Sequence, residues 1–94
     1  MTVASRFRAG RKEIDIVARR DGIVAFVEVK TRRGLGFGHP LEAITHKKQR
    51  EIAEVARDWL RQNPGRAGSV RFDAIAIVTR GSGAPVIEHL PNAW

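Results

Sequence analysis

The hydrophobic and polar positions follow a two-residue period near the start and near the end of the chain, with a helical period between them. A two-residue period is typical of β-strands, whose successive side chains point to opposite faces. It predicts five strands, over residues 2–8, 12–20, 23–32, 70–79 and 85–90. Pro85 at the start of the last strand suits an edge position. Trp94 is expected to pack on the sheet.

The helical period lies between the third and fourth strands. Apolar residues recur there with the spacing of a helix face that packs on a sheet, at Ile52, Val55, Ala56, Trp59 and Leu60. We expect this helix to begin at Leu41 or Thr45 and to end near Asn63, before Pro64-Gly65. Residues 32–40, with three glycines and a proline, are predicted to form a loop.

Asp21-Gly22, between the second and third strands, is a strong signal for a β-hairpin. A loop of two or of four residues places Asp15 opposite Glu28 and Glu13 opposite Lys30, whereas a loop of three breaks this register. In the first case all four side chains share one face of the hairpin. Because the residues beyond them are apolar on both faces, the hairpin is expected to be central in its sheet and covered above and below.

The acidic patch on this hairpin has two interpretations. Like charges directly opposite each other are destabilising, so a positive group must offset Asp15 and Glu28. These two carboxylates, converging with a backbone carbonyl, provide the oxygen ligands that Mg²⁺ or Mn²⁺ prefers, which indicates a metal-dependent active site. The alternative is a structural ion-pair cluster with Lys30 and no chemistry. The residues taken alone favour that alternative.

Length and charge restrict the function classes. The 94 residues are enough for one small domain, residues 1–94, and the net charge of +7 with a pI near 11.3 favours a nucleic acid partner. A basic surface that serves only solubility is the competing explanation. The chain has no cysteine, no apolar run near the roughly 20 residues of a membrane span and no signal-peptide pattern. We therefore expect a cytoplasmic protein without a membrane partner.

Basic residues near the hairpin extend the predicted site. Lys48 and Gln49 flank the apolar stripe at the helix start and are expected to line the site, where either side chain would steady a water molecule or a phosphate. Asp73, inside an apolar strand, is predicted first to be structural, with Arg71 or Arg32 as its partner. The residues expected to contact nucleic acid are Arg32, Arg33, Lys47, Lys48 and Arg50.

Asp15 followed by Glu28-Val29-Lys30 at the end of the next strand resembles the signature of PD-(D/E)XK nucleases. Longer stretches resemble the YraN-like family of predicted endonucleases, which is similar to archaeal Holliday-junction resolvases. These stretches are EIDIVARRDG, FVEVKTR, FGHPLEAI followed by Lys48-Gln49-Arg50, RFDAIAIV and IEHLPNAW. The resemblance covers nearly all 94 residues. It implies an α/β fold with a restriction-endonuclease-like mixed sheet of about five strands and one main helix.

The resemblance also implies an endonuclease that cuts phosphodiester bonds of DNA, branched or structured, with Mg²⁺ or Mn²⁺ held by Asp15 and Glu28. Lys30 would assist the attacking water, and as a cation beside two carboxylates we assign it to stabilising the phosphorane or orienting the water. Glu13 matches the family's Gly-Glu-Ile-Asp run and is an additional candidate, although Lys12 stands where that run has glycine. Together with Gln49 these residues form the predicted catalytic set.

Two further expectations follow from departures from that family. Its members begin with a helix, often carrying another glutamate, whereas this chain starts almost at the first strand. An uncovered apolar sheet face would then favour a homodimer, and loss of the glutamate raises the alternative of a catalytically inactive nucleic-acid-binding protein with a nuclease fold. That protein would bind in a salt-dependent, metal-independent way through Arg6, Arg8, Arg32, Arg33, Lys47 and Arg50.

Overall fold

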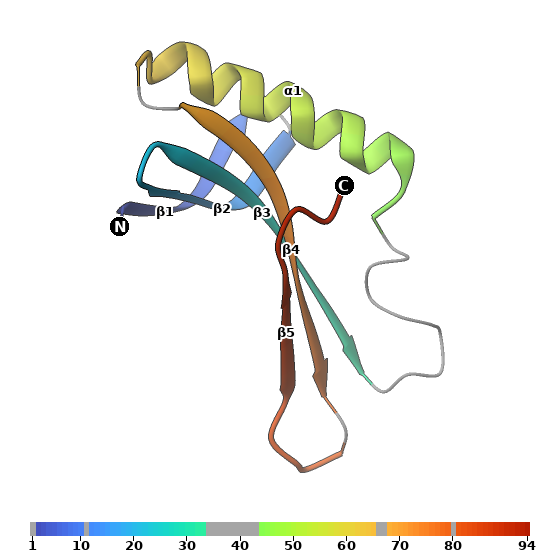
Figure 1. Cartoon of the computed structure of the whole chain (residues 1–94). Helices are drawn as coiled ribbons and strands as arrows, with labels where there is room; N and C mark the ends of the chain where they lie inside the picture. The colour runs from blue at the N-terminus through green and yellow to red at the C-terminus, as the bar shows by residue number, and fades with distance from the viewer. Residues whose placement is uncertain (1, 11, 34–43, 66–67, 80) are drawn as a thin grey trace.

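Five strands form one mixed sheet, and a single described helix lies across it (Figure 1). The computed structural model describes residues 2–10, 12–33, 44–65, 68–79 and 81–94. The elements are β1 (Thr2–Ala9), β2 (Lys12–Arg20), β3 (Ile23–Arg33), α1 (His46–Gln62), β4 (Ser69–Thr79) and β5 (Val86–Leu90). No helix among the described residues combines the length and the apolarity that a bilayer crossing requires. The predicted α/β architecture is confirmed.

The strand order is β1-β2-β3-β4-β5, with β3 and β4 parallel and the other neighbours antiparallel. The hairpin of β2 and β3 is thus central, and β5 is an edge strand, as its leading proline indicates. Most of the predicted loop, residues 34–40, and the predicted helix start at Leu41 lie outside the described residues. The other predicted helix start is confirmed, because the Thr45 side chain accepts a hydrogen bond from the Lys48 amide at 3.2 Å and caps α1.

The turn between β2 and β3 has the conformation that Asp-Gly favours. Asp21 and Gly22 both have positive φ, 52° and 79°, as a two-residue hairpin turn with right-handed twist requires. The register runs from Arg20 opposite Ile23 to Ile16 opposite Val27, which confirms the predicted pairing over this stretch. The carbonyl of Gly22 also accepts the amides of Gly68 and Ser69, at 2.6 and 3.1 Å. The turn is therefore fixed to the start of β4.

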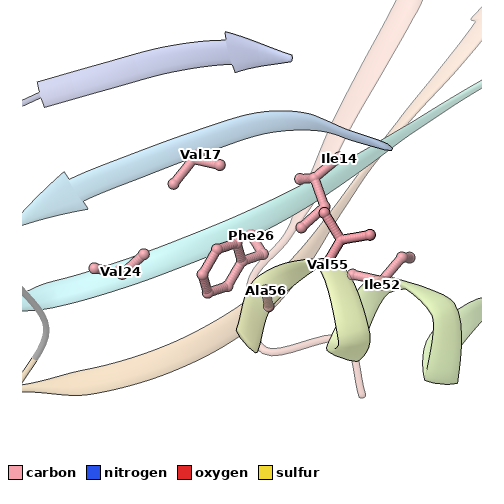
Figure 2. Packing of buried hydrophobic residues seen from close by; sticks show 7 residues of the cluster. All are labelled: Ile14, Val17, Val24, Phe26, Ile52, Val55 and Ala56. Atoms are coloured by element: carbon pink, nitrogen blue, oxygen red, sulfur yellow. The ribbon is translucent and has the colours of Figure 1, made fainter. Parts of the chain in front are cut away.

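The core lies between α1 and the adjoining face of the sheet (Figure 2). Phe26 is its central ring and is fully buried; its ring centroid lies 5.8 Å from those of both Trp59 and Phe72. Trp94 stacks on Phe72 at 5.9 Å, as expected for a residue packed on the sheet. The residues that form the core cluster are Ile14, Val17, Val24, Phe26, Ile52, Val55 and Ala56.

The two faces of the hairpin are buried in different ways. Phe26 faces α1, so its neighbours Ala25 and Val27 face the other side of the sheet. The described part of the chain contributes no helix to that side. Ala25 and Val27 are nevertheless only 6% and 5% exposed. The predicted burial of the hairpin on both faces is therefore confirmed at these positions, with a helix on one of the two faces among the described residues.

The buried carboxylate of Asp73 fastens β5 and the C-terminal residues to β4. Arg71 donates to it through Nε and Nη2, both at 2.8 Å, and the Asn92 amide donates at 2.9 Å. His89 Nε2 lies 2.9 Å from the same group. The predicted structural role with Arg71 is confirmed. Burial alone would raise the pKa of Asp73, but the bonds from Arg71, Asn92 and His89 outweigh it and hold the pKa below its ordinary value of 3.8.

Acidification is expected to weaken the fold through Asp73. Because its folded-state pKa is depressed, the charged carboxylate stabilises the protein above the unfolded-state pKa, and this contribution is lost as the pH falls through the folded value. Replacing Asp73 with asparagine should lower the free energy of unfolding by about 2 kcal/mol or more near neutral pH. The free energy of unfolding of this variant should also fall less steeply than that of the wild type as the pH is lowered. Urea unfolding between about pH 2 and pH 6 measures both effects.

The exposed Asp21 supplies a matched control, since its side chain is 87% exposed. Asp21→Asn keeps a residue type that tolerates positive φ and should change stability by no more than about 0.5 kcal/mol. An Asp73→Asn variant that loses stability in acid as steeply as the wild type would contradict the role assigned to this carboxylate.

Candidate metal centre

Asp15 and Glu28 meet where the regular pairing of β2 with β3 ends. One position beyond the pair of Ile16 and Val27, the Asp15 side chain takes the place of a backbone acceptor: its Oδ2 accepts the Val29 amide at 2.9 Å. In a continued antiparallel ladder that amide would face the backbone of Ile14. The hydrogen bond fixes the Asp15 carboxylate beside β3.

Glu28 extends from β3 on the same side of the sheet as Phe26 and is 5% exposed. The Asp15 carboxylate is close enough to raise the pKa of Glu28. Lys30 Nζ lies 3.7 Å from Glu28 Oε1. The second oxygen, Oε2, is buried and has no hydrogen-bond partner among the described residues. The structure thus brings Asp15, Glu28 and Lys30 together, as the hairpin register predicts.

The surroundings of Glu28 are unfavourable to its charged form. Burial raises the pKa of Glu28 most, and the neighbouring Asp15 charge raises it further. Lys48 of α1 and Lys30 act in the opposite direction but do not cancel these effects, so the pKa stays above its ordinary value of 4.5. A buried carboxylate beside a second one, which the protein's own cations compensate only in part, is an arrangement common at functional sites.

Whether these residues suit a divalent ion can be judged from the unpartnered Glu28 oxygen. An oxygen-ligated cation would give Oε2 the partner that it lacks and would neutralise the second carboxylate. Among the described residues no group of three or more His, Cys, Asp and Glu side chains gathers into a metal site. Mg²⁺ needs only one or two protein carboxylates, because it keeps several waters and takes substrate phosphate oxygens. Asp15 and Glu28 therefore fit Mg²⁺ or Mn²⁺.

Glu13 is placed differently from the prediction. The continued register puts it opposite Lys30, but the structure pairs it with Arg8 of β1, whose Nη2 lies 3.2 Å from Glu13 Oε2. The reason is that the β2–β3 pairing ends before this point, whereas Arg8 lies directly opposite Glu13 in the β1–β2 register. The Gly10 turn between those strands was the sequence signal for this partner.

A pocket of about 520 Å³ adjoins the carboxylates between the β1–β2 turn and α1. Lys48 lines this pocket and is also one of the charges that act on Glu28. The pocket and the Glu28 carboxylate are therefore neighbours. The residues that line the pocket are Arg8, Gly10, Lys12, Glu13, Lys48, Glu51 and Ile52. Its mixture of cations and carboxylates leaves room for a charged, hydrated ligand beside the metal centre.

The other predicted site residues lie on α1 and at the end of β3. The Gln49 amide donates to the Ile44 carbonyl at 3.3 Å, so it is engaged at the start of α1. Lys47 and Arg50 are exposed on α1. Arg32 lies two positions beyond Lys30 on the same face of β3, with its Nε buried and unpartnered among the described residues. By the same alternation, the exposed Arg33 belongs to the opposite face.

Comparison with known proteins places the chain in a family. The model of the uncharacterised protein family UPF0102 matches residues 1–77. A UPF0102 protein of Trichlorobacter lovleyi is 46% identical over 89 residues, which are 94% of this chain and 70% of that protein. One of Chloroherpeton thalassium is 47% identical over 72 residues, 77% of this chain and 56% of that protein.

A third relative, a UPF0102 protein of Rhodococcus opacus, is 44% identical over 88 residues, 94% of this chain and 75% of that protein. The chain thus spans between about a half and three quarters of the length of these relatives. The family model covers most of the chain, and two of the three matches cover nearly all of it. This chain belongs to the uncharacterised protein family UPF0102.

Proposed function

We propose that this protein is a metal-dependent endonuclease of the PD-(D/E)XK type that hydrolyses phosphodiester bonds in branched or structured DNA. The observation that carries the proposal is the pair of half-buried Asp15 and buried Glu28, with one Glu28 carboxylate oxygen unpartnered among the described residues. A purely structural pair would have its oxygens satisfied, because an unpaired buried polar group costs about 1–3 kcal/mol. Lys30 approaches only the other oxygen, at 3.7 Å.

In this proposal Asp15 and Glu28 hold one Mg²⁺ or Mn²⁺ ion. The bound ion would lower the pKa of water and neutralise negative charge on the phosphate. The Val29 amide keeps the Asp15 carboxylate in position. Lys30 contributes a fixed positive charge beside Glu28, where it would orient the attacking water or stabilise the phosphorane. Hydrolysis forms a bond from the water oxygen to phosphorus and releases one bridging oxygen as a hydroxyl group.

The DNA contacts are proposed on the α1 side of the sheet. Lys48 extends toward the carboxylates from the first turn of α1, and Lys47 and Arg50 are exposed beside it. Arg32 continues the row of Glu28 and Lys30 along β3. Phosphate contacts by cations of this kind position a duplex without reading its sequence. We therefore expect selectivity for DNA shape.

The experiment is a cleavage assay on a four-way junction, a fork, a linear duplex and a single strand, each with Mg²⁺, Mn²⁺ or chelator. We expect metal-dependent cleavage that is at least about tenfold faster on the branched substrates, which corresponds to about 1.4 kcal/mol. Calorimetry should show Mn²⁺ binding at a site that Glu28→Gln removes. Absence of cleavage of every substrate with both metals would refute the proposal.

A second candidate function is nucleic acid binding without catalysis. The net charge of +7 and the exposed cations Arg33, Lys47 and Arg50 favour it, because they do not depend on the carboxylate pair. The side chain of Arg6, which we also expect to contribute, lies outside the described part of the structure. This function predicts salt-dependent binding that neither metal nor Asp15→Asn alters.

A further inference from the structure

A second pocket, of about 280 Å³, lies at the turn end of the β2–β3 hairpin. Its floor contains a row of neighbours on three adjacent strands, Ala18, Ala25 and Arg71. Because Phe26 faces α1, Ala25 and the members of this row face the opposite side of the sheet. The pocket is thus separated from the candidate metal centre by the sheet itself.

The charged side chains on this face are two arginines, Arg20 and Arg71, each paired with a carboxylate, of Asp21 and Asp73. Three arginines and one aspartate take part in its lining, together with Ala18, Ile23 and Ala25. Arg20 lies 3.6 Å from Asp21, and both side chains are largely exposed. Arg19 pairs with Val24, which faces α1, so by side-chain alternation its guanidinium belongs to the other face. The pocket therefore combines an apolar floor with the guanidinium groups of Arg20 and Arg71. An anionic ligand with a flat apolar part complements this combination, whereas a cationic one does not.

Arg71 is held in one orientation by the Asp73 carboxylate. Its Nε and Nη2 atoms both donate at 2.8 Å to a group that is 1% exposed, while the Arg71 side chain keeps 37% exposure. The guanidinium plane is therefore both fixed and accessible. A fixed guanidinium plane stacks well on a nucleobase, because little side-chain entropy is lost on binding.

The frame around the pocket is also fixed before any ligand binds. The turn residues have the positive φ values that their hairpin requires, and the Gly22 carbonyl holds the amides of Gly68 and Ser69 at 2.6 and 3.1 Å. Ile23, at the edge of the floor, is 40% exposed although it is large and apolar. An exposed apolar residue on a preformed frame beside two arginines is suited to ligand contact.

We propose that this pocket binds an unpaired nucleotide of a nucleic acid strand. The base lies against Ala18, Ile23 and the guanidinium plane of Arg71, and an adjoining phosphate contacts Arg20. The volume suits a single base, since pockets for whole drug-sized ligands measure about 300–1,000 Å³. The net charge of +7 favours a polyanionic strand over a free nucleotide.

The test compares two single variants that remove the same charge. Arg20→Gln changes the pocket, and Arg61→Gln changes α1 on the other side of the sheet; each arginine lies beside an aspartate, Asp21 and Asp58 respectively. Affinity for a short single-stranded oligonucleotide is measured by fluorescence anisotropy in chelator. We expect the pocket variant to lose at least about tenfold in affinity and the α1 variant no more than about threefold, because only the first removes directed contacts. Equal losses would overturn the proposal.

A second measurement does not depend on variants that must fold. In NMR titrations of the wild type, the oligonucleotide should shift the amides of Asp21, Gly22 and Ala25, and a mononucleotide should shift the same amides at higher concentration. Shifts confined to α1, or saturation of the pocket by the mononucleotide without competition from the strand, would refute strand binding. The proposal rests on nucleic acid binding and not on cleavage, so the same amide shifts are expected when the titration is repeated with the Asp15→Asn variant. This test is therefore independent of the proposed endonuclease activity.

Discussion

Replacing Asp15 with asparagine is expected to reduce DNA cleavage at least about a thousandfold, equivalent to about 4 kcal/mol of transition-state stabilisation. The asparagine side chain has the same shape, and its Oδ1 atom can still accept the Val29 amide that now bonds to Asp15 at 2.9 Å. It lacks the negative charge that a divalent ion requires. Single-turnover cleavage rates measure the loss, and DNA affinity in chelator should change by less than about threefold.

Stability distinguishes a catalytic pair from a structural one. The Asp15 charge raises the pKa of Glu28, so removing it relieves the repulsion that Asp15 exerts on the buried Glu28 carboxylate. We therefore expect Asp15→Asn to melt at the same temperature as the wild type or higher, as happens when a functional residue is not optimised for stability. Asp58→Asn on α1 is the matched control and should retain cleavage. A destabilised Asp15→Asn variant that still cleaves DNA would contradict the proposed site.

Replacing Phe26 with alanine is expected to lower the free energy of unfolding by about 3–5 kcal/mol. The ring is fully buried and contacts Trp59 and Phe72, so its removal leaves a cavity between α1 and the sheet. A domain of this length has a total stability of only about 5–14 kcal/mol. The variant should therefore unfold at a much lower urea concentration, which circular dichroism can follow.

The exposed face of β5 provides the comparison for this core substitution. Ile87 is also large and apolar, but it is 65% exposed. Ile87→Ala should cost about 1 kcal/mol or less, because little surface is uncovered and no cavity forms. Equal costs at the two positions would show that the core is not centred on Phe26.

The hairpin is the part of the fold that the sequence predicts most fully. Asp21-Gly22 requires positive φ at both positions, and that turn type fixes which residues of β2 and β3 face each other. The register brings Asp15 to the level of Glu28, and the hydrogen bond from the Val29 amide to the Asp15 carboxylate then fixes that side chain beside β3. Local turn chemistry therefore carries enough information to predict a contact between residues on different strands.

The prediction becomes less accurate where a side chain replaces the backbone. The Asp15 carboxylate accepts the Val29 amide, so the regular ladder ends and Glu13 pairs with Arg8 instead of approaching Lys30. The hydrophobic periodicity of a sequence predicts regular strands. It does not predict where a side-chain carboxylate replaces a backbone acceptor in the ladder. The sequence also contains several cations that would suit Glu13, and only the β1–β2 register selects among them.

Asp73 shows a second limit. An aspartate inside an apolar strand predicts a buried carboxylate that needs donors, and Arg71 two positions away is an evident one. His89 and the Asn92 amide are 16 and 19 positions away and reach it only because β5 returns beside β4. Partners that depend on strand order cannot be found before the strand order is known.

The parallel pairing of β3 with β4 has a consequence for how the chain folds. Ile23 pairs with Ser69, 46 positions later, whereas the β2–β3 hairpin closes over two residues. Hairpins form in about 1–10 μs, but long-range parallel pairing must first overcome the entropy of closing a large loop. Docking of β4 should therefore limit the refolding rate. Until it occurs, the open edge of β3 is the segment through which chains can aggregate.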